Sequence, residues 1–69
     1  MHVTFGKVHY NDHDERFEAR VDIHRQGKTF RYPCTLRGPV DMDGDQVRLG
    51  LARQAMRMSD TSSQVMATL

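Results

Sequence analysis

Apolar and polar residues alternate over residues 17–36, on both sides of the Gln26-Gly27 pair. A period of two is typical of a half-buried strand, and Gly27 can adopt the positive φ that a two-residue hairpin turn needs. Folding the segment at this turn places its apolar side chains on one face: Phe17, Ala19, Val21, Ile23, Phe30, Tyr32, Cys34 and Leu36. Because a slip of one residue would expose this whole set, the pattern predicts a hairpin with a well-defined register.

The other face of the predicted hairpin is polar, and it pairs Asp22 with Arg31 across the two strands. Counting from the turn makes Arg20 and Pro33 a non-hydrogen-bonded pair, so the missing N–H of Pro33 points away from the first strand of the hairpin. A proline in this position is tolerated only on an edge strand. We therefore expect the second strand of the hairpin at an edge of the sheet.

Residues 3–10 also alternate, but the phase of the alternation changes at Gly6. A β-bulge at Gly6 would place the apolar residues of both halves on one face: Val3, Phe5, Val8 and Tyr10. A polar connection follows at residues 11–15. The sheet is therefore predicted to be a three-stranded antiparallel β-meander, with the strands in chain order.

A helix start is indicated after the sheet, where Asp43 and Gln46 have the spacing of a capping box. Met42 and Val47 stand where a hydrophobic staple would place them. The competing interpretation is a hairpin turn at Asp43-Gly44, since Asp-Gly is also a strong turn signal.

Residues 49–58 favour the helix, because they are rich in strong helix formers and contain no β-branched residue. The helix is predicted over residues 44–58, packed on one face of the sheet. The chain is thus expected to be a single α+β domain over residues 1–58. Residues 59–69 are polar and lack periodicity, so we expect them to form a flexible C-terminal tail.

The apolar side of the predicted helix is wider than a sheet can cover. The residues expected to face the sheet form a normal core stripe: Val47, Leu51, Ala55 and Met58. Further apolar residues extend the arc to about 200°, where about 100° is enough for packing on a sheet. We call this additional surface the helix rim, and it consists of Arg48, Leu49, Ala52 and Met56.

Either a partner or the chain itself must cover the helix rim. The N-terminal strand could fold over it, as could the tail with Val65, Met66 and Leu69. A domain of 69 residues supplies only a small core, which favours stabilisation by a second chain. We therefore expect a protein-interaction module that acts as a homodimer through the helix rim, with another protein as the alternative partner.

The charge balance and the cysteine content indicate which partners and which cellular compartment to expect. Ten basic and nine acidic residues leave a net charge of +1, so no strong overall field attracts nucleic acid or an anionic membrane. Cys34 is the only cysteine, which excludes a disulfide within the chain. With no apolar leader or long apolar run, these features predict a cytoplasmic protein that does not enter a membrane.

Catalytic chemistry finds no support in the sequence. Cys34 belongs to the apolar face of the hairpin, so we expect a buried and unreactive thiol. The serines stand in the tail without a general base, and no pair of carboxylates is held among apolar residues. The chain is therefore predicted not to be an enzyme and to need no cofactor.

Two clusters of polar residues resemble metal sites in their composition. Counting from Asp41 as the first position, Gly44 falls at position four and Ala52 at position twelve, which does not match a calcium-binding EF-hand loop. His9 and His13 are four residues apart, a spacing that binds zinc when both stand on one helix. Binding of a metal ion through these two histidines is kept as an alternative function.

The order of three strands and a helix resembles the second part of a double-stranded-RNA-binding domain, and residues 12–30 are similar in texture to the first hairpin of that family. The resemblance implies RNA binding, here through Lys7, Arg20, Arg31 and Arg48. However, the chain lacks the family's N-terminal helix. It also carries acidic residues where the family has a lysine-rich helix start: Asp41, Asp43 and Asp45. RNA binding is therefore an alternative, and nucleic acid is not the expected partner.

Overall fold

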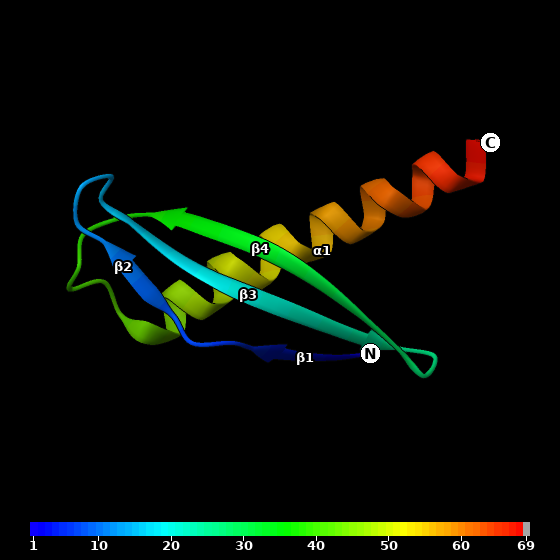
Figure 1. Cartoon of the computed structure of the whole chain (residues 1–69), viewed down its shortest axis with the longest axis horizontal. Helices are drawn as coiled ribbons and strands as arrows, with labels where there is room; N and C mark the ends of the chain where they lie inside the picture. The colour runs from blue at the N-terminus through cyan, green and yellow to red at the C-terminus, as the bar shows by residue number, and fades with distance from the viewer. Residues whose placement is uncertain (69) are drawn as a thin grey trace.

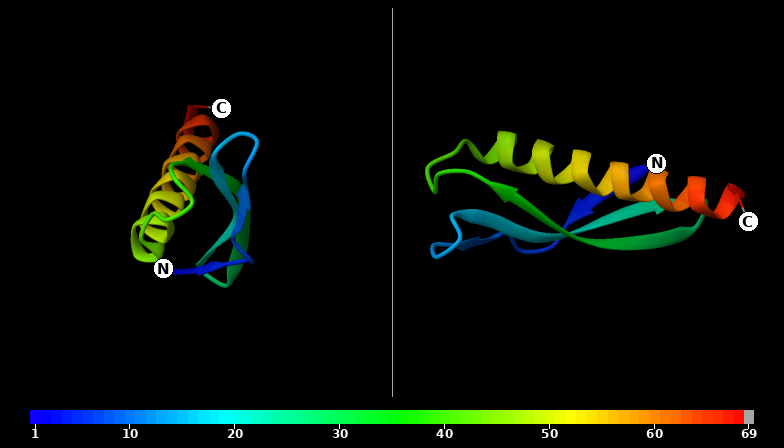
Figure 2. Two further views of the ribbon diagram at one scale, coloured as in Figure 1. Left: turned by 90° about the vertical axis from the view of Figure 1, so that its left-hand side faces the viewer. Right: turned by 90° about the horizontal axis from the view of Figure 1, so that it is seen from above.

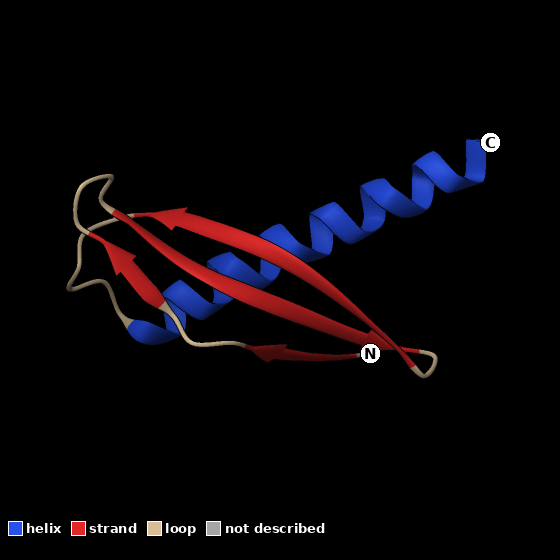
Figure 3. Cartoon of the chain, viewed as in Figure 1, coloured by secondary structure: helices blue, strands red, loops and turns tan. Residues whose placement is uncertain are grey.

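A computed structural model describes the backbone of residues 1–68 and the side chains of residues 1–60. The elements in chain order are β1 (His2–Phe5), β2 (His9–Asn11), β3 (Arg16–Arg25), β4 (Lys28–Arg37) and α1 (Gly44–Thr68). The four strands form one antiparallel sheet, and α1 crosses one face of it (Figure 1; Figure 3). The α+β class is confirmed, whereas the predicted number of three strands is wrong because the first expected strand is divided into β1 and β2.

The β3–β4 hairpin has the predicted register. Asp22 stands opposite Arg31, and Arg20 stands opposite Pro33. Both turn residues have positive φ, 52° at Gln26 and 74° at Gly27, which defines a type I′ turn. This turn matches the right-handed twist of the two strands, and β4 pairs with β3 alone, as Pro33 requires.

The other edge of β3 is shared by β1 and β2, which lie one after the other along it. Three residues from Gly6 to Val8 stand opposite two residues of β3, so the edge contains one extra residue, as the phase change predicted. The Gly6 N–H donates to the Arg20 carbonyl over 2.8 Å. The bulge returns Tyr10 to the face of the core, but Val8 is exposed. The prediction for Val8 is wrong because this residue lies inside the bulge.

The helix begins at Gly44, and the Val47 N–H donates to the Asp43 carbonyl over 3.0 Å. The interpretation of Asp43-Gly44 as a hairpin turn is therefore wrong. Among the described residues, no side-chain hydrogen bond of Asp43 or Gln46 completes a capping box. Met42 instead anchors this end of the helix by packing against the core.

The core lies between α1 and the sheet. Its buried members come from β3, β4 and the predicted stripe of the helix: Phe17, Ala19, Val21, Ile23, Cys34, Val47, Leu51 and Ala55. Gly50 allows α1 to approach β4 closely, since a Cβ atom at this position would lie 2.8 Å from a methyl carbon of Leu36. The Gln54 side chain accepts a hydrogen bond from the Thr35 N–H over 2.8 Å, which occupies part of the free edge of β4.

The helix continues to Thr68, well past the predicted end at residue 58. No glycine or proline stands between residues 59 and 68 to end it. The backbone of this segment therefore continues along the helix axis and does not turn back over residues 49–56, while Leu69 lies outside the described residues. No helix in the described part of the chain is long and apolar enough to cross a membrane.

The molecule is thin and elongated, with principal extents of 41 × 22 × 15 Å. Its radius of gyration is 13.1 Å, whereas a compact domain of this length has about 11 Å. Figure 2 shows the reason: the molecule consists of only two layers, the sheet and the single helix α1. The face of the sheet that points away from α1 is not covered by any further element of the described chain.

Candidate interaction surfaces

The helix rim lies on the side of α1 that points away from the core stripe. Leu49 is 51% exposed and Met56 is 37% exposed, and they are the two large apolar side chains of α1 that are exposed among the described residues. Ala52 is half-buried at the edge of this surface. Arg48 is exposed and forms an ion pair of 2.5 Å with Asp45. The structure thus brings all four residues of the helix rim onto one exposed surface.

Neither of the intramolecular covers considered for the helix rim forms. β1 is paired with β3, and residues 59–68 continue the helix. Leu49 and Met56 therefore remain accessible in the isolated chain. That a second molecule covers them stays a prediction.

The total accessible surface is larger than expected for this mass. The chain of 8.0 kDa exposes 5188 Å², whereas a compact monomer of that mass exposes about 4,450 Å². The excess of about 700 Å² agrees with the thin, elongated shape of the molecule.

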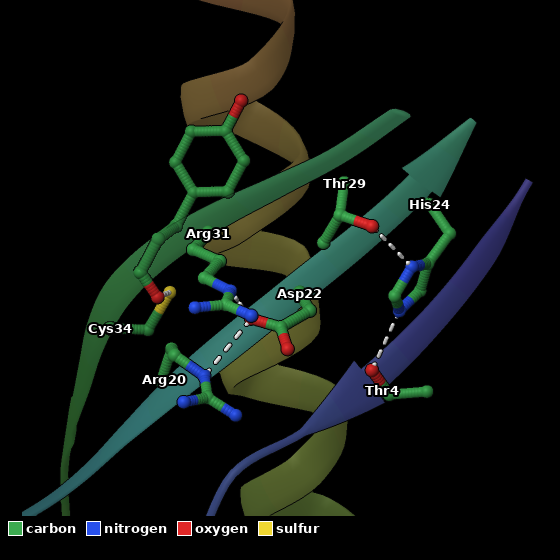
Figure 4. A network of polar contacts seen from close by, with 8 residues as sticks. Thr4, Arg20, Asp22, His24, Thr29, Arg31 and Cys34 are labelled. Carbon is green, nitrogen blue, oxygen red and sulfur yellow. Dashed lines mark hydrogen bonds and ion pairs between the residues drawn. The ribbon is translucent and has the colours of Figure 1, made fainter. Parts of the chain in front are cut away.

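A second surface is the face of the sheet opposite α1, which we call the open face. Asp22 lies at its centre and is only 7% exposed, although no other layer covers it. The Nε atoms of Arg20 and Arg31 lie 3.1 Å and 4.0 Å from the same carboxylate oxygen, Oδ1 (Figure 4). The aliphatic stems of such long side chains can cover a residue while their charged ends stay in water. The two arginines contribute to the burial of Asp22 in this way, together with Thr4, which stands opposite it on β1.

The charge at this centre is not balanced. Two guanidinium groups face one carboxylate, and the Oδ1 atom has no hydrogen-bond partner of good geometry among the described residues. The side chains of Arg20 and Arg31 are 53% and 67% exposed, so most of each guanidinium group is available to solvent. An excess of one positive charge is therefore held at a defined position.

His24 connects three strands beside this centre. Its Nε2 atom lies 2.9 Å from the Thr4 hydroxyl of β1, and its Nδ1 atom lies 3.0 Å from the Thr29 hydroxyl of β4. A neutral imidazole has one donor and one acceptor nitrogen, and a hydroxyl can complement either of them. The His2 ring lies 5.5 Å from the His24 ring. These contacts hold the end of the open face near the hairpin turn.

The residues predicted for RNA binding do not form one site. Arg20 and Arg31 lie together on the open face, and Lys7 is exposed in the bulge. Arg48 lies on α1, on the other side of the sheet, where Asp45 neutralises it. The three aspartates before and within the first helical turn are all exposed, as expected for solvated charges: Asp41, Asp43 and Asp45.

The two histidines of the alternative metal site lie on different segments of the chain. His9 lies in β2 and His13 in the turn that follows it. Among the described residues, no group of three or more His, Cys, Asp or Glu side chains could hold a metal ion. Cys34 is buried, and its thiol donates to the Tyr32 carbonyl over 3.6 Å. Burial raises the pKa of the Cys34 thiol, which disfavours the reactive thiolate.

The comparisons with known proteins add no relative. No family model matches the chain, and neither a curated protein nor a solved structure matches it. What the chain can bind is therefore inferred from the geometry of the helix rim and of the open face.

Proposed function

We propose that this protein is a non-catalytic interaction module that forms a homodimer through the helix rim. The observation that carries the proposal is the exposure of Leu49 and Met56 on the outer side of α1. Both side chains lie within the helix, where the backbone is already ordered, so their burial requires no further folding of the chain.

A second copy is the partner that the size of the molecule favours. The chain has two thin layers and a small core, and dimerisation is a common way to stabilise such a domain. In a twofold-symmetric interface each contact is made twice, so the two apolar side chains of the helix rim provide four at the contact.

The experiment compares the mass in solution of the unmodified chain with that of Leu49→Glu and Met56→Glu. We expect the unmodified chain to have twice the 8.0 kDa of one protomer at micromolar concentration. Each glutamate would place two charges in the apolar interface and yield a folded monomer. Light scattering after a sizing column measures the mass, and far-UV circular dichroism confirms the fold.

Gln46→Glu is the matched control, because Gln46 is an exposed residue of α1 outside the helix rim. This variant gains the same charge and is expected to remain dimeric. A dimer that persists in Leu49→Glu and Met56→Glu would show that copies associate through another surface. A monomeric unmodified chain would contradict self-association altogether.

A further inference from the structure

The open face of the β3–β4 hairpin carries an uneven distribution of charge. Its cationic side chains are Arg16, Arg20, Arg31 and Arg37, and its acidic side chains are Glu18 and Asp22. Arg16 is paired with Asp14 over 3.4 Å, so four arginines face three carboxylates and this surface has an excess of one positive charge. The arginines are not evenly spread, since Asp22 draws two of them together.

Arg20 and Arg31 leave much of their guanidinium groups available to a further anion. The Asp22 carboxylate faces the Nε atom of Arg20, and the Nη groups of Arg20 point away from it (Figure 4). The Nε atom of Arg31 lies 4.0 Å from the same oxygen, and its side chain is 67% exposed. A planar guanidinium group binds the oxygen atoms of a phosphate in a bidentate manner. Because the Asp22 carboxylate lies 3.1 Å from Arg20 and restrains that side chain, a phosphate bound to Arg20 would cost less side-chain entropy than one bound to a free arginine.

A shallow depression adjoins Arg20 on the same face. It is lined by Glu18, Ala19, Arg20, Pro33, Cys34 and Thr35. Pro33 is an exposed apolar residue of this lining, and Glu18 supplies a carboxylate that can accept hydrogen bonds. The depression therefore suits a flat group with N–H donors on its edge.

We propose that the open face binds a phosphate monoester that carries a flat heterocycle, as in a nucleoside monophosphate. Arg20 and Arg31 hold the phosphate, and the heterocycle lies over Pro33 with its edge toward Glu18. Asp22 is a positioning residue, which acts on the ligand through Arg20. This site is separate from the helix rim, so it does not depend on the proposed dimer.

The test is a titration with adenosine monophosphate, followed by the amide and arginine side-chain resonances in two-dimensional NMR spectra. Inorganic phosphate and adenosine serve as separate probes for the two parts of the ligand. We expect saturable shifts at Arg20, Arg31 and the residues around Pro33, with tighter binding of the nucleotide than of either probe. Arg20→Gln and Arg31→Gln should each weaken binding by about tenfold or more, since each removes charged hydrogen bonds.

The controls separate this proposal from general charge effects and from the dimer. Arg53→Gln removes an exposed arginine of α1 and should leave the affinity unchanged. Leu49→Glu should also bind the nucleotide normally. Arg20→Gln and Arg31→Gln should fold, because both side chains are more than half exposed. An absence of saturable shifts would overturn the proposal, as would equal losses of affinity in Arg20→Gln and Arg53→Gln. Equal affinities for the nucleotide and inorganic phosphate would refute the contact with Pro33.

Discussion

Truncation of Leu51 to alanine is expected to lower the free energy of unfolding by about 3–4 kcal/mol. Leu51 is fully buried between α1 and the sheet. Removing three buried carbons costs about 2.4 kcal/mol at roughly 0.8 kcal/mol each. The cavity that remains raises the loss into the range of about 2.7–5 kcal/mol that is typical of Leu→Ala in a core. A domain of this length has a total stability of roughly 3–10 kcal/mol, so the variant would lose a third or more of it.

Leu49→Ala provides a comparison with the same chemical change two residues away. Leu49 is 51% exposed, so only about half of the burial free energy of the removed carbons is lost, and no closed cavity forms. We expect the free energy of unfolding of the monomer to fall by about 1 kcal/mol. If Leu49 lies in a dimer interface, the variant additionally weakens the association of the two chains.

Urea denaturation followed by far-UV circular dichroism, at several protein concentrations, measures both effects. Unfolding of a dimer becomes more difficult by about 1.4 kcal/mol for each tenfold increase in concentration. Leu51→Ala should lower the free energy of unfolding at every protein concentration and leave its dependence on concentration unchanged. Leu49→Ala should make the free energy of unfolding depend less on concentration. A loss of less than about 1 kcal/mol in the free energy of unfolding of Leu51→Ala would refute this reasoning. So would a loss in Leu49→Ala that equals that of Leu51→Ala at the lowest protein concentration.

Two further predictions concern the hairpin. Gln26 has a φ of 52°, which costs a side chain such as glutamine about 1 kcal/mol and is tolerated better by asparagine, so Gln26→Asn should raise the thermal midpoint. A lower midpoint would contradict the type I′ turn. For Cys34, burial raises the thiol pKa above its ordinary value of 9.0, so the folded chain retains the proton longer than the unfolded chain. The resulting stability is complete below pH 9 and falls as the pH rises above it. Urea midpoints between pH 8 and 10 should show this decline, and Cys34→Ala should flatten it; equal slopes would argue against a buried thiol.

The hairpin was predictable because its evidence is local. The alternation predicts which residues share the face of the core, and the Gln26-Gly27 turn fixes the register between the strands. It does not predict how far each residue is buried, because Phe30 lies on that face and is 40% exposed. The break between β1 and β2 was only half predictable. The phase change at Gly6 revealed the extra residue, but it did not reveal that Val8 would be the residue left outside the core.

The end of the helix was missed for a physical reason as well. The prediction relied on the loss of apolar periodicity after residue 58, yet backbone hydrogen bonds can continue a helix where no glycine or proline interrupts it. Periodicity reports which residues pack on the sheet, and it does not report where the backbone leaves the helical conformation.

The two candidate surfaces differ in what the sequence could show. The helix rim was visible on a helical wheel, because the apolar arc is a property of the helix alone. For the open face, the sequence predicted that Asp22 stands opposite Arg31. The burial of Asp22 depends on how two arginine side chains lie over it, which is a tertiary property. The excess charge at that point was therefore not predictable from the sequence.

The most direct test of the account is an isotope-filtered nuclear Overhauser experiment on a mixture of labelled and unlabelled chains, which detects only contacts between molecules. Contacts from the methyl groups of Leu49 and Met56 of one copy to α1 of another are the result we predict. If no intermolecular contact appears at millimolar concentration, or if the contacts arise only from the open face, the helix rim is not the surface through which this protein associates.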